Sequence, residues 1–337
     1  MNYFITGGTG FIGTHLAHLL HEVHPEAKIY NLDIVKPGTP LPTVKNYKPV
    51  LRKGEEHAAT FIYCDVRQPI ELEKVSITPD DVIFNFAAVH RTPGHPDPAY
   101  FETNIRGAEN VCAFAHRHGI RKMVFTSSIA PYGAAEELKE ETTLPTPNTP
   151  YGISKLVAEK IHVAWQAGSP ERQLTIVRPG VVFGRGENGN FTRLYWGIRG
   201  HKFMYPGRKD TIKACIYVKE LVRFMLYRLE HHDSGVELYN CCYEPAYTIE
   251  HIVESMKRVT NMKVKVPFMP GWLIMTAAGI AGALGSPMGI CPARVRKLQI
   301  STNICGKKLS ASGYRFRYTF EEALADWYKD NGNLYLQ

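Results

Sequence analysis

The chain opens on the stretch Asn2-Tyr3-Phe4-Ile5-Thr6-Gly7-Gly8-Thr9-Gly10-Phe11-Ile12-Gly13, in which an apolar run leads directly into a glycine-rich turn. The pattern predicts a buried strand, a tight turn and the start of a helix. Gly7, Gly10 and Gly13 each have a physical reason: positive φ, close approach of a pyrophosphate to the backbone, and close packing of helix on strand. The N–H groups and the dipole of the helix start then favour a bound phosphate.

An acidic residue follows this turn at the spacing that a dinucleotide site requires. Asp33 stands at the end of a second apolar run, residues 29–32. A carboxylate there accepts hydrogen bonds from ribose hydroxyls and repels a 2′-phosphate, so the pattern predicts NAD as the cofactor. Lys36 lies close by and could receive a 2′-phosphate, which leaves NADP as the alternative.

The length and composition of the chain predict a globular protein with a complete hydrophobic core. The 337 residues are 44% hydrophobic, which is enough to bury a complete α/β core. The net charge is +8, but the 40 lysines and arginines are scattered. We therefore expect an attraction for phosphate-bearing small molecules and no nucleic-acid partner.

Cysteine usage predicts neither a disulfide framework nor a metal site. The seven cysteines form no C-x-x-C pair and leave one residue over. The first predicted strand begins at residue 2, which leaves no room for a signal peptide. We expect a cytoplasmic protein without a bound metal.

Apolar runs alternate with helical patterns and predict a Rossmann-type, doubly wound parallel sheet. The helices that matter most for the site are expected at 99–118 and 150–166. We expect an NAD-binding part over residues 1–180 and a smaller substrate-binding lobe over 181–337, interwoven with the first. The predicted strands are 2–6, 28–33, 60–64, 82–87, 122–127 and 174–178.

Two segments stand outside this pattern. Residues 35–59 are rich in Pro, Lys and Gly and predict a solvated surface excursion without chemistry. Residues 266–293 contain no charged side chain, and Trp272–Leu284 is strongly apolar. Prolines and glycines interrupt it before the ~20 residues that a spanning helix needs. The prediction is a buried or lid helix over an apolar pocket, with peripheral membrane contact as the alternative.

Three side chains suit hydride transfer between a carbinol and a nicotinamide. Tyr151 and Lys155 are four residues apart and share one face of a predicted helix, and Ser128 ends a predicted strand. A phenol with a pKa of ~10 is a poor base, but a cation beside it stabilises the phenolate. A serine hydroxyl can hold the substrate oxygen.

With these motifs the chain resembles the extended short-chain dehydrogenase/reductases, in the nucleotide-sugar epimerase/dehydratase group. The likeness is specific up to Gly184 and weaker beyond it. It implies Ser128, Tyr151 and Lys155 as catalytic residues, with Ser127 as the next candidate for the serine. It implies these cofactor contacts: Gly7, Gly10, Phe11, Ile12, Gly13, Asp33, Asp65, Val66, Phe86, Ala87, Ala88, Asn104, Tyr151, Lys155 and Pro179.

The resemblance also indicates where the substrate binds. Its members often have an asparagine where Val181 stands, a proline where Arg185 stands and a diphosphate-binding arginine where Lys213 stands. Asn190, at a predicted helix start, is a further candidate for the diphosphate. The implied substrate contacts are Ser128, Val181, Asn190 and Lys213. Dehydratases of the group carry an Asp-Glu pair where this chain has Ile129-Ala130, which disfavours elimination.

The resemblance leaves several activities open. The first is an NAD-dependent epimerase of a nucleotide-diphospho-sugar that oxidises C4 transiently. The alternatives are a reductase of a nucleotide-linked 4-ketosugar, and a 3β-hydroxysteroid dehydrogenase-like or dihydroflavonol reductase-like enzyme with an apolar substrate. A non-catalytic nucleotide sensor would not need Ser128, Tyr151 and Lys155 together. The resemblance further implies a homodimer built on the two long helices.

Overall fold

A computed structural model of the chain describes residues 1–39, 49–52, 54–90, 95–133, 135–233, 235–273, 276 and 299–337.

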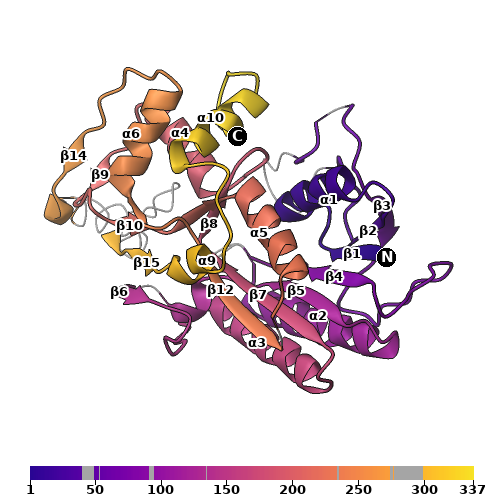
Figure 1. Cartoon of the computed structure of the whole chain (residues 1–337). Helices are drawn as coiled ribbons and strands as arrows, with labels where there is room; N and C mark the ends of the chain where they lie inside the picture. Colours follow the sequence, from indigo (N-terminus) through magenta and orange to yellow (C-terminus); the bar gives the residue numbers. More distant parts are fainter. Residues whose placement is uncertain are drawn as a thin grey trace.

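A seven-stranded parallel sheet forms the centre of the molecule (Figure 1). Its order is β12-β7-β5-β4-β1-β2-β3, which confirms the predicted doubly wound fold. All six predicted strands are present, whereas β12 was not predicted. The strands are β1 (Asn2–Thr6), β2 (Lys28–Asp33), β3 (Thr60–Tyr63), β4 (Val82–Asn85), β5 (Lys122–Thr126), β7 (Gln173–Pro179) and β12 (Val236–Cys241).

Helices cover both faces of this sheet because side chains of a strand alternate between the faces. Tyr3 and Ile5 pack with α1 (Phe11–Val23) and α5 (Val218–Glu230) on one face. Phe4 packs on the other face with α2 (Asp97–Arg117) and α3 (Pro150–Ala167). The central strands β1, β4 and β5 are therefore buried on both sides, as their continuous apolar runs predict, whereas the edge strand β3 is partly exposed.

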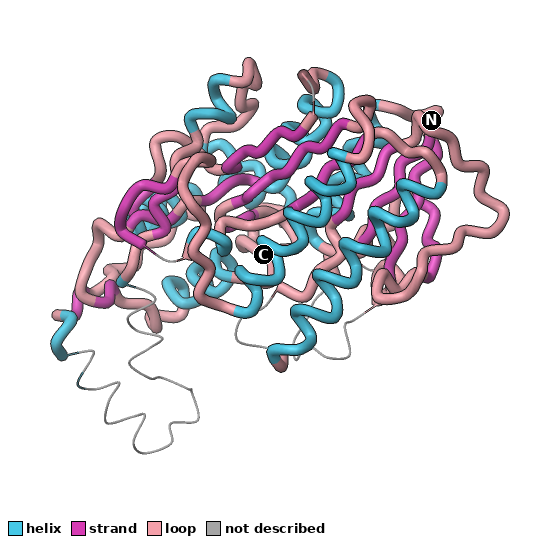
Figure 2. The backbone as a smooth tube through the Cα atoms, turned by 90° about the horizontal axis from the view of Figure 1, so that it is seen from below, coloured by secondary structure: helices cyan, strands magenta, loops and turns pink. Residues whose placement is uncertain are grey.

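The two long helices of the second face lie side by side across the sheet (Figure 2). Each lies within three residues of its predicted bounds at either end. Ile153 and Val157 of α3 are exposed to solvent. A homodimer built on these helices stays a prediction.

The lobe beside the sheet consists of short elements around an aromatic core that includes Phe183, Phe320 and Trp327. Its largest sheet has the order β13-β10-β15-β6. The division at residues 180 and 181 stays a prediction. The elements are η1 (Ala130–Tyr132), β6 (Ala135–Lys139), β8 (Val181–Phe183), α4 (Asn190–Arg199), β9 (Tyr205–Pro206), β10 (Ile212–Lys213), β11 (Cys215–Tyr217), β13 (Tyr247–Thr248), α6 (Ile249–Val259), β14 (Phe268–Met269), β15 (Thr302–Ile304), α9 (Lys307–Ala311) and α10 (Phe320–Asp330).

The expectation that residues 35–59 form a solvated excursion is wrong for the end of that segment. Val50 and Leu51 are buried. The Nδ1 atom of His57 accepts a hydrogen bond from the Ala59 N–H, so the Nε2–H donates to the carbonyl of Gly8 at 3.0 Å. Val50 lies against Gly186, and the His57 bond holds the end of the segment against the glycine turn.

Most of the charge-free stretch 266–293 lies outside the described residues, and so does most of the lid helix predicted there. Its described beginning, residues 266–273, is solvent-exposed at several apolar side chains. Among the residues that the structure describes, no helix combines the length and the apolar character that crossing a membrane requires.

The glycine turn allows a test of close packing. Gly7 has φ +70°, and a Cβ there would lie 2.8 Å from the Ala87 nitrogen, whereas Gly38 has φ +77° and nothing within 4 Å. We expect Gly38→Ala to cost about 1–2 kcal/mol from backbone strain alone. Gly7→Ala adds a steric clash with the backbone, so its loss of unfolding free energy, measured with urea, should be clearly larger. Equal losses in the two variants would show that the turn can shift to accommodate the Cβ without further cost.

Candidate active site

The glycine turn leaves an open backbone surface at the carboxyl end of β1. The Gly7 N–H donates to the carbonyl of Leu32 at 2.8 Å, which fixes the turn. A Cβ at Gly13 would lie 2.6 Å from the Gly8 Cα, so helix and turn are in contact. A Cβ at Gly10 would meet only the Gly7 oxygen within 4 Å, at 3.1 Å. The surface beside Gly10 and the start of α1 can therefore accept a pyrophosphate.

Asp33 lies at the edge of this turn, at the end of β2. Its carboxylate accepts hydrogen bonds from the N–H groups of Thr9 at 3.1 Å and Val35 at 3.0 Å. Burial raises the pKa of Asp33, and these hydrogen bonds oppose the rise. The carboxylate thus orders the turn and has further lone pairs for ribose hydroxyls.

The neighbouring strand ends line the same edge of the sheet. Phe86, Ala87 and Ala88 are partly exposed directly after β4, and Ala87 lies against Gly7. Val66, after β3, is buried, and its Cγ2 would lie 2.9 Å from a Cβ at Gly107. Phe86 and Ala87 therefore flank the glycine turn at the edge where open α/β sheets bind ligands, while Val66 lies against α2.

Tyr151, Lys155 and Ser128 meet where β5 ends and α3 begins. Tyr151 and Ser128 share a side-chain hydrogen bond that lowers the pKa of the phenol, but burial outweighs it and raises that pKa to about 12. The Lys155 amine donates to the Thr126 carbonyl at 2.7 Å and lies 4.8 Å from the centre of the Phe125 ring. Burial lowers the pKa of Lys155 to about 7, while the charge of Glu159 opposes this.

Asn104 joins the elements of the site. Its carboxamide accepts from the Val89 N–H at 2.8 Å and donates to the Val89 carbonyl at 3.0 Å and to the Ser154 hydroxyl at 2.8 Å. Ser154 in turn donates to the carbonyl of Tyr151. Asn104 is among the predicted cofactor contacts, and the structure shows how it couples the segment after β4 to α3, the helix that carries Tyr151 and Lys155.

A buried ion pair joins α3 to β7 one helical turn beyond Lys155. Arg178 of β7 donates to both oxygens of Glu159 on α3, at 2.8 and 2.6 Å. Ser127 donates to the same carboxylate at 2.5 Å. Because Ser127 is buried in this network and Ser128 is partly exposed beside Tyr151, the geometry favours Ser128 as the catalytic serine.

The segments expected to bind substrate lie beside Ser128. The Ile129 N–H donates to the Pro179 carbonyl at 3.3 Å, and the Val181 N–H donates to the Ala214 carbonyl at 2.8 Å. Lys213 of β10 precedes Ala214, and its amine donates to the Ile300 carbonyl at 2.7 Å. Lys213 therefore lies next to the site, with its amine already bound to a carbonyl.

Asn190 occupies the predicted helix start but is exposed there and accepts a hydrogen bond from Arg193. The Glu187 carboxylate already accepts from the N–H groups of Phe191 and Thr192. A diphosphate that binds the N–H groups of Phe191 and Thr192 would therefore have to replace the Glu187 carboxylate.

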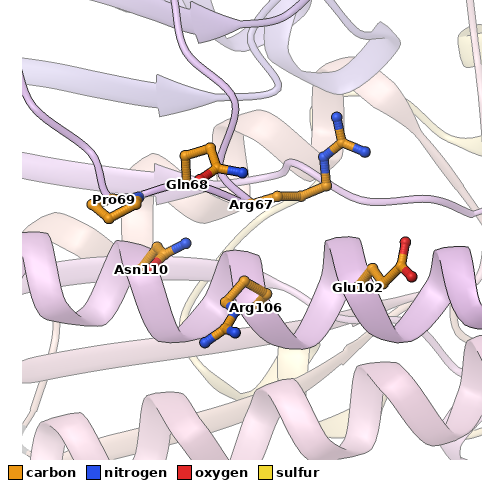
Figure 3. A pocket seen from close by; sticks show the side chains of 6 residues that line it. All are labelled: Arg67, Gln68, Pro69, Glu102, Arg106 and Asn110. Carbon is orange, nitrogen blue, oxygen red and sulfur yellow. The ribbon is translucent and has the colours of Figure 1, made fainter.

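A hollow of about 650 Å³ lies between α2 and the segment after β3 (Figure 3). Glu102, Arg106 and Asn110 line it from α2, opposite Arg67, Gln68 and Pro69. Arg67 is paired with Asp65, one of the predicted cofactor contacts. Neither the glycine turn nor Ser128 lines this hollow, so it lies apart from these two parts of the candidate active site.

Sequence reasoning missed Glu159, Ser154 and His57. Glu159 continues the four-residue spacing of Tyr151 and Lys155, so it lies on the same helix face, and that spacing could have indicated it. Ser154 and His57 act through contacts far apart in sequence, with Asn104 and with the Gly8 carbonyl. No local pattern indicates those contacts.

The donor and acceptor set fits NAD and gives no indication of a metal. Gly10 leaves room at a helix start, Asp33 offers a carboxylate, and the buried Thr126 hydroxyl has no hydrogen-bond partner within the described ranges. No group of three or more His, Cys, Asp or Glu side chains there could hold a metal ion.

Comparisons with known proteins show the family of this chain. A model of the NAD dependent epimerase/dehydratase family matches residues 3–242. An N-acetyl-α-D-glucosaminyl-diphospho-ditrans,octacis-undecaprenol 4-epimerase of Escherichia coli O157:H7 is 30% identical over 330 residues, which cover 96% of this chain and 93% of that protein. A UDP-glucose 4-epimerase of Yersinia enterocolitica is 25% identical, covering 78% of this chain and 84% of the relative.

Solved structures confirm the fold. A UDP-glucuronic acid 4-epimerase from Bacillus cereus in complex with NAD has a TM-score of 0.72 to this chain at 18% identity, covering 99% of this chain and 100% of the other. The predicted resemblance and the prediction of NAD are thereby confirmed.

The two adjacent serines can be separated by substitution. Ser128→Ala should lower kcat about 10- to 1,000-fold with little change in the melting temperature, because it removes a partner of Tyr151. Ser127→Ala should mainly lower stability, by about 1–3 kcal/mol, because it leaves the buried Glu159 carboxylate one donor short. Steady-state kinetics and urea unfolding measure both. The reverse pattern would exchange the two roles.

Lys155 makes stability depend on pH. Its pKa is about 7 in the folded chain against 10.5 for an unperturbed lysine, so the unfolded chain binds more protons between these values. The stability of wild type relative to Lys155→Met should therefore rise with pH across that window, by at most about 1.4 kcal/mol per pH unit. Urea unfolding between about pH 7 and pH 9 measures this difference. Lys160→Met, at an exposed position of α3, is the control, and an equal slope there would contradict the assignment.

Proposed function

The chain belongs to the NAD-dependent epimerase/dehydratase family, and we propose that it inverts C4 of a sugar carried on a diphosphate. The observation that supports this most directly is the hydrogen bond between Tyr151 and Ser128, with the Lys155 amine bound to Thr126 at the end of strand β5. The relatives described above share the same reaction, 4-epimerisation. Dehydration is disfavoured because Ile129 and Ala130 offer no acid after Ser128.

In the proposed reaction Tyr151 accepts the proton of the C4 hydroxyl while Ser128 holds the oxygen. Bound NAD supplies the acceptor and later the donor of the C4 hydride. Lys155 stabilises the negative charge of the phenolate, because its amine lies one helical turn away on the same face. Tyr151 then returns the proton to the C4 oxygen after the hydride has come back to the opposite face of the sugar. One proton and one hydride leave and return, so the reaction is redox-neutral overall.

We infer further that the diphosphate is joined to a polyprenol and that the sugar is an N-acetylhexosamine. The relative with this kind of substrate aligns with nearly the whole chain, including the lobe. Residues 266–293 carry no charge, which suits a lipid better than a nucleoside. A nucleotide-linked sugar is the second candidate, supported by the UDP-sugar 4-epimerases among the relatives.

The test uses N-acetylglucosamine deuterated at C4, carried either on a short polyprenyl diphosphate in detergent or on UDP. With the lipid-linked sugar, we expect the C4 epimer to form without added NAD and to keep its deuterium. A hydride that is removed and returned remains in the product, whereas a reductase consumes one cofactor per turnover. Mass spectrometry measures the deuterium that the product keeps, and absorbance at the NADH wavelength measures cofactor consumption. Tyr151→Phe is the inactive control.

Each competing activity gives a different result. Loss of deuterium together with net cofactor consumption would indicate the reductase. Faster turnover of the UDP-linked sugar than of the lipid-linked sugar would assign the nucleotide as the carrier. Turnover by Tyr151→Phe at the wild-type rate would show that another group carries the proton.

A further inference from the structure

The end of the lobe that lies opposite the N-terminus exposes large apolar side chains. Phe268 of β14 is 50% exposed, and Trp272 and Leu273, just beyond it, are 71% and 41% exposed. Met204, directly before β9, is also exposed. Figure 1 shows β9 and β14 together at this end. Single exposed apolar residues are common, but several in adjacent segments indicate an interaction surface.

Backbone contacts hold these residues in one place. The Tyr205 N–H donates to the Pro267 carbonyl and the Gly207 N–H donates to the Met269 carbonyl, each at 2.9 Å. A Cβ at Gly207 would lie 2.9 Å from the Gly271 Cα, so the helical residues 271–273 begin in contact with the strand pair. We call Met204, Phe268, Trp272 and Leu273 the β9–β14 face.

Basic side chains adjoin this face. In residues 262–266, Met262, Val264 and Val266 pack on the lobe core, while Lys263 and Lys265 alternate with them and are exposed. Within the described residues neither lysine has a carboxylate partner at ion-pair distance. By contrast, Arg208 nearby is paired with Glu136 and Asp210.

We propose that the β9–β14 face docks the protein on an anionic phospholipid bilayer. Tryptophan and phenylalanine side chains are stabilised at the boundary between headgroups and acyl chains, and lysines beside them are attracted by anionic headgroups. This proposal rests on the proposed function, because a polyprenyl diphosphate is held in a bilayer by its lipid tail.

The position of the face suits such a substrate. Residues 207–211 join β9 directly to β10, which ends at Lys213. Ala214, the next residue, packs in one cluster with Ile129, the neighbour of Ser128. A short continuous part of the lobe therefore links the bilayer-facing end to the side of the site where the diphosphate is expected.

The experiment is sedimentation of the whole protein with vesicles of phosphatidylglycerol and phosphatidylethanolamine, compared with phosphatidylcholine alone. We expect binding to the anionic vesicles and a loss of about ten-fold or more in affinity for the double variants Phe268→Ser/Trp272→Ser and Lys263→Glu/Lys265→Glu. The lysine contribution should weaken with added salt.

Matched double variants at other surfaces are the controls. Leu144→Ser/Leu334→Ser replaces two residues that are 78% and 64% exposed elsewhere. Lys28→Glu/Lys307→Glu changes the net charge equally at two other exposed lysines. Both controls should bind anionic vesicles like wild type, and melting temperatures verify that every variant is folded.

The proposal is overturned if wild type does not bind the anionic vesicles, or if Phe268→Ser/Trp272→Ser binds as tightly as wild type. Epimerisation of detergent-solubilised substrate separates this failure from failure of the proposed function. Loss of vesicle binding with unchanged turnover in detergent supports the docking face. Absence of turnover by wild type in detergent rejects the proposed function, whatever the vesicles show.

Discussion

The Glu159 carboxylate is the interaction on which the geometry of the site depends. It lies on α3, one turn after Lys155, and receives donors from Arg178 on β7 and from Ser127 at the end of β5. A buried ion pair of this kind adds little net stability, because both charges lose their hydration. Its directional bonds nevertheless fix how α3 lies against the two strands. Tyr151 and Lys155, which we propose to be catalytic, lie on this helix and are positioned as a consequence.

Burial acts in opposite directions on the two titratable groups of that helix. It raises the pKa of Tyr151 and lowers the pKa of Lys155, so the protein alone disfavours both the phenolate and the ammonium. A site of this kind stabilises charge mainly when a charged molecule enters it. In the proposed reaction, proton transfer at Tyr151 is therefore linked to binding of such a molecule.

The sequence was sufficient to predict the parts of the fold that depend on local patterns. The glycine turn, the six strands and the Tyr151-Lys155 spacing follow from periodicity and from fixed offsets, and the structure places Ser128 with them. Features built from distant contacts were not predictable. The bond from His57 to Gly8 overturned the solvated excursion, and Asn104 links Val89 to Ser154 across the fold. The lobe was the least predictable part, because its strands are two to five residues long.

The place of β12 in the sheet has a consequence for folding. All of β12 pairs with β7, although more than fifty residues separate the two strands in the sequence. Those intervening residues include the first part of the lobe. Until Cys241 has left the ribosome, β7 presents unpaired N–H and C=O groups along an open edge, which is a template for aggregation. Contacts this distant in sequence also slow folding. The nascent chain is therefore prone to aggregation until β12, the last strand of the sheet to be synthesised, pairs with β7.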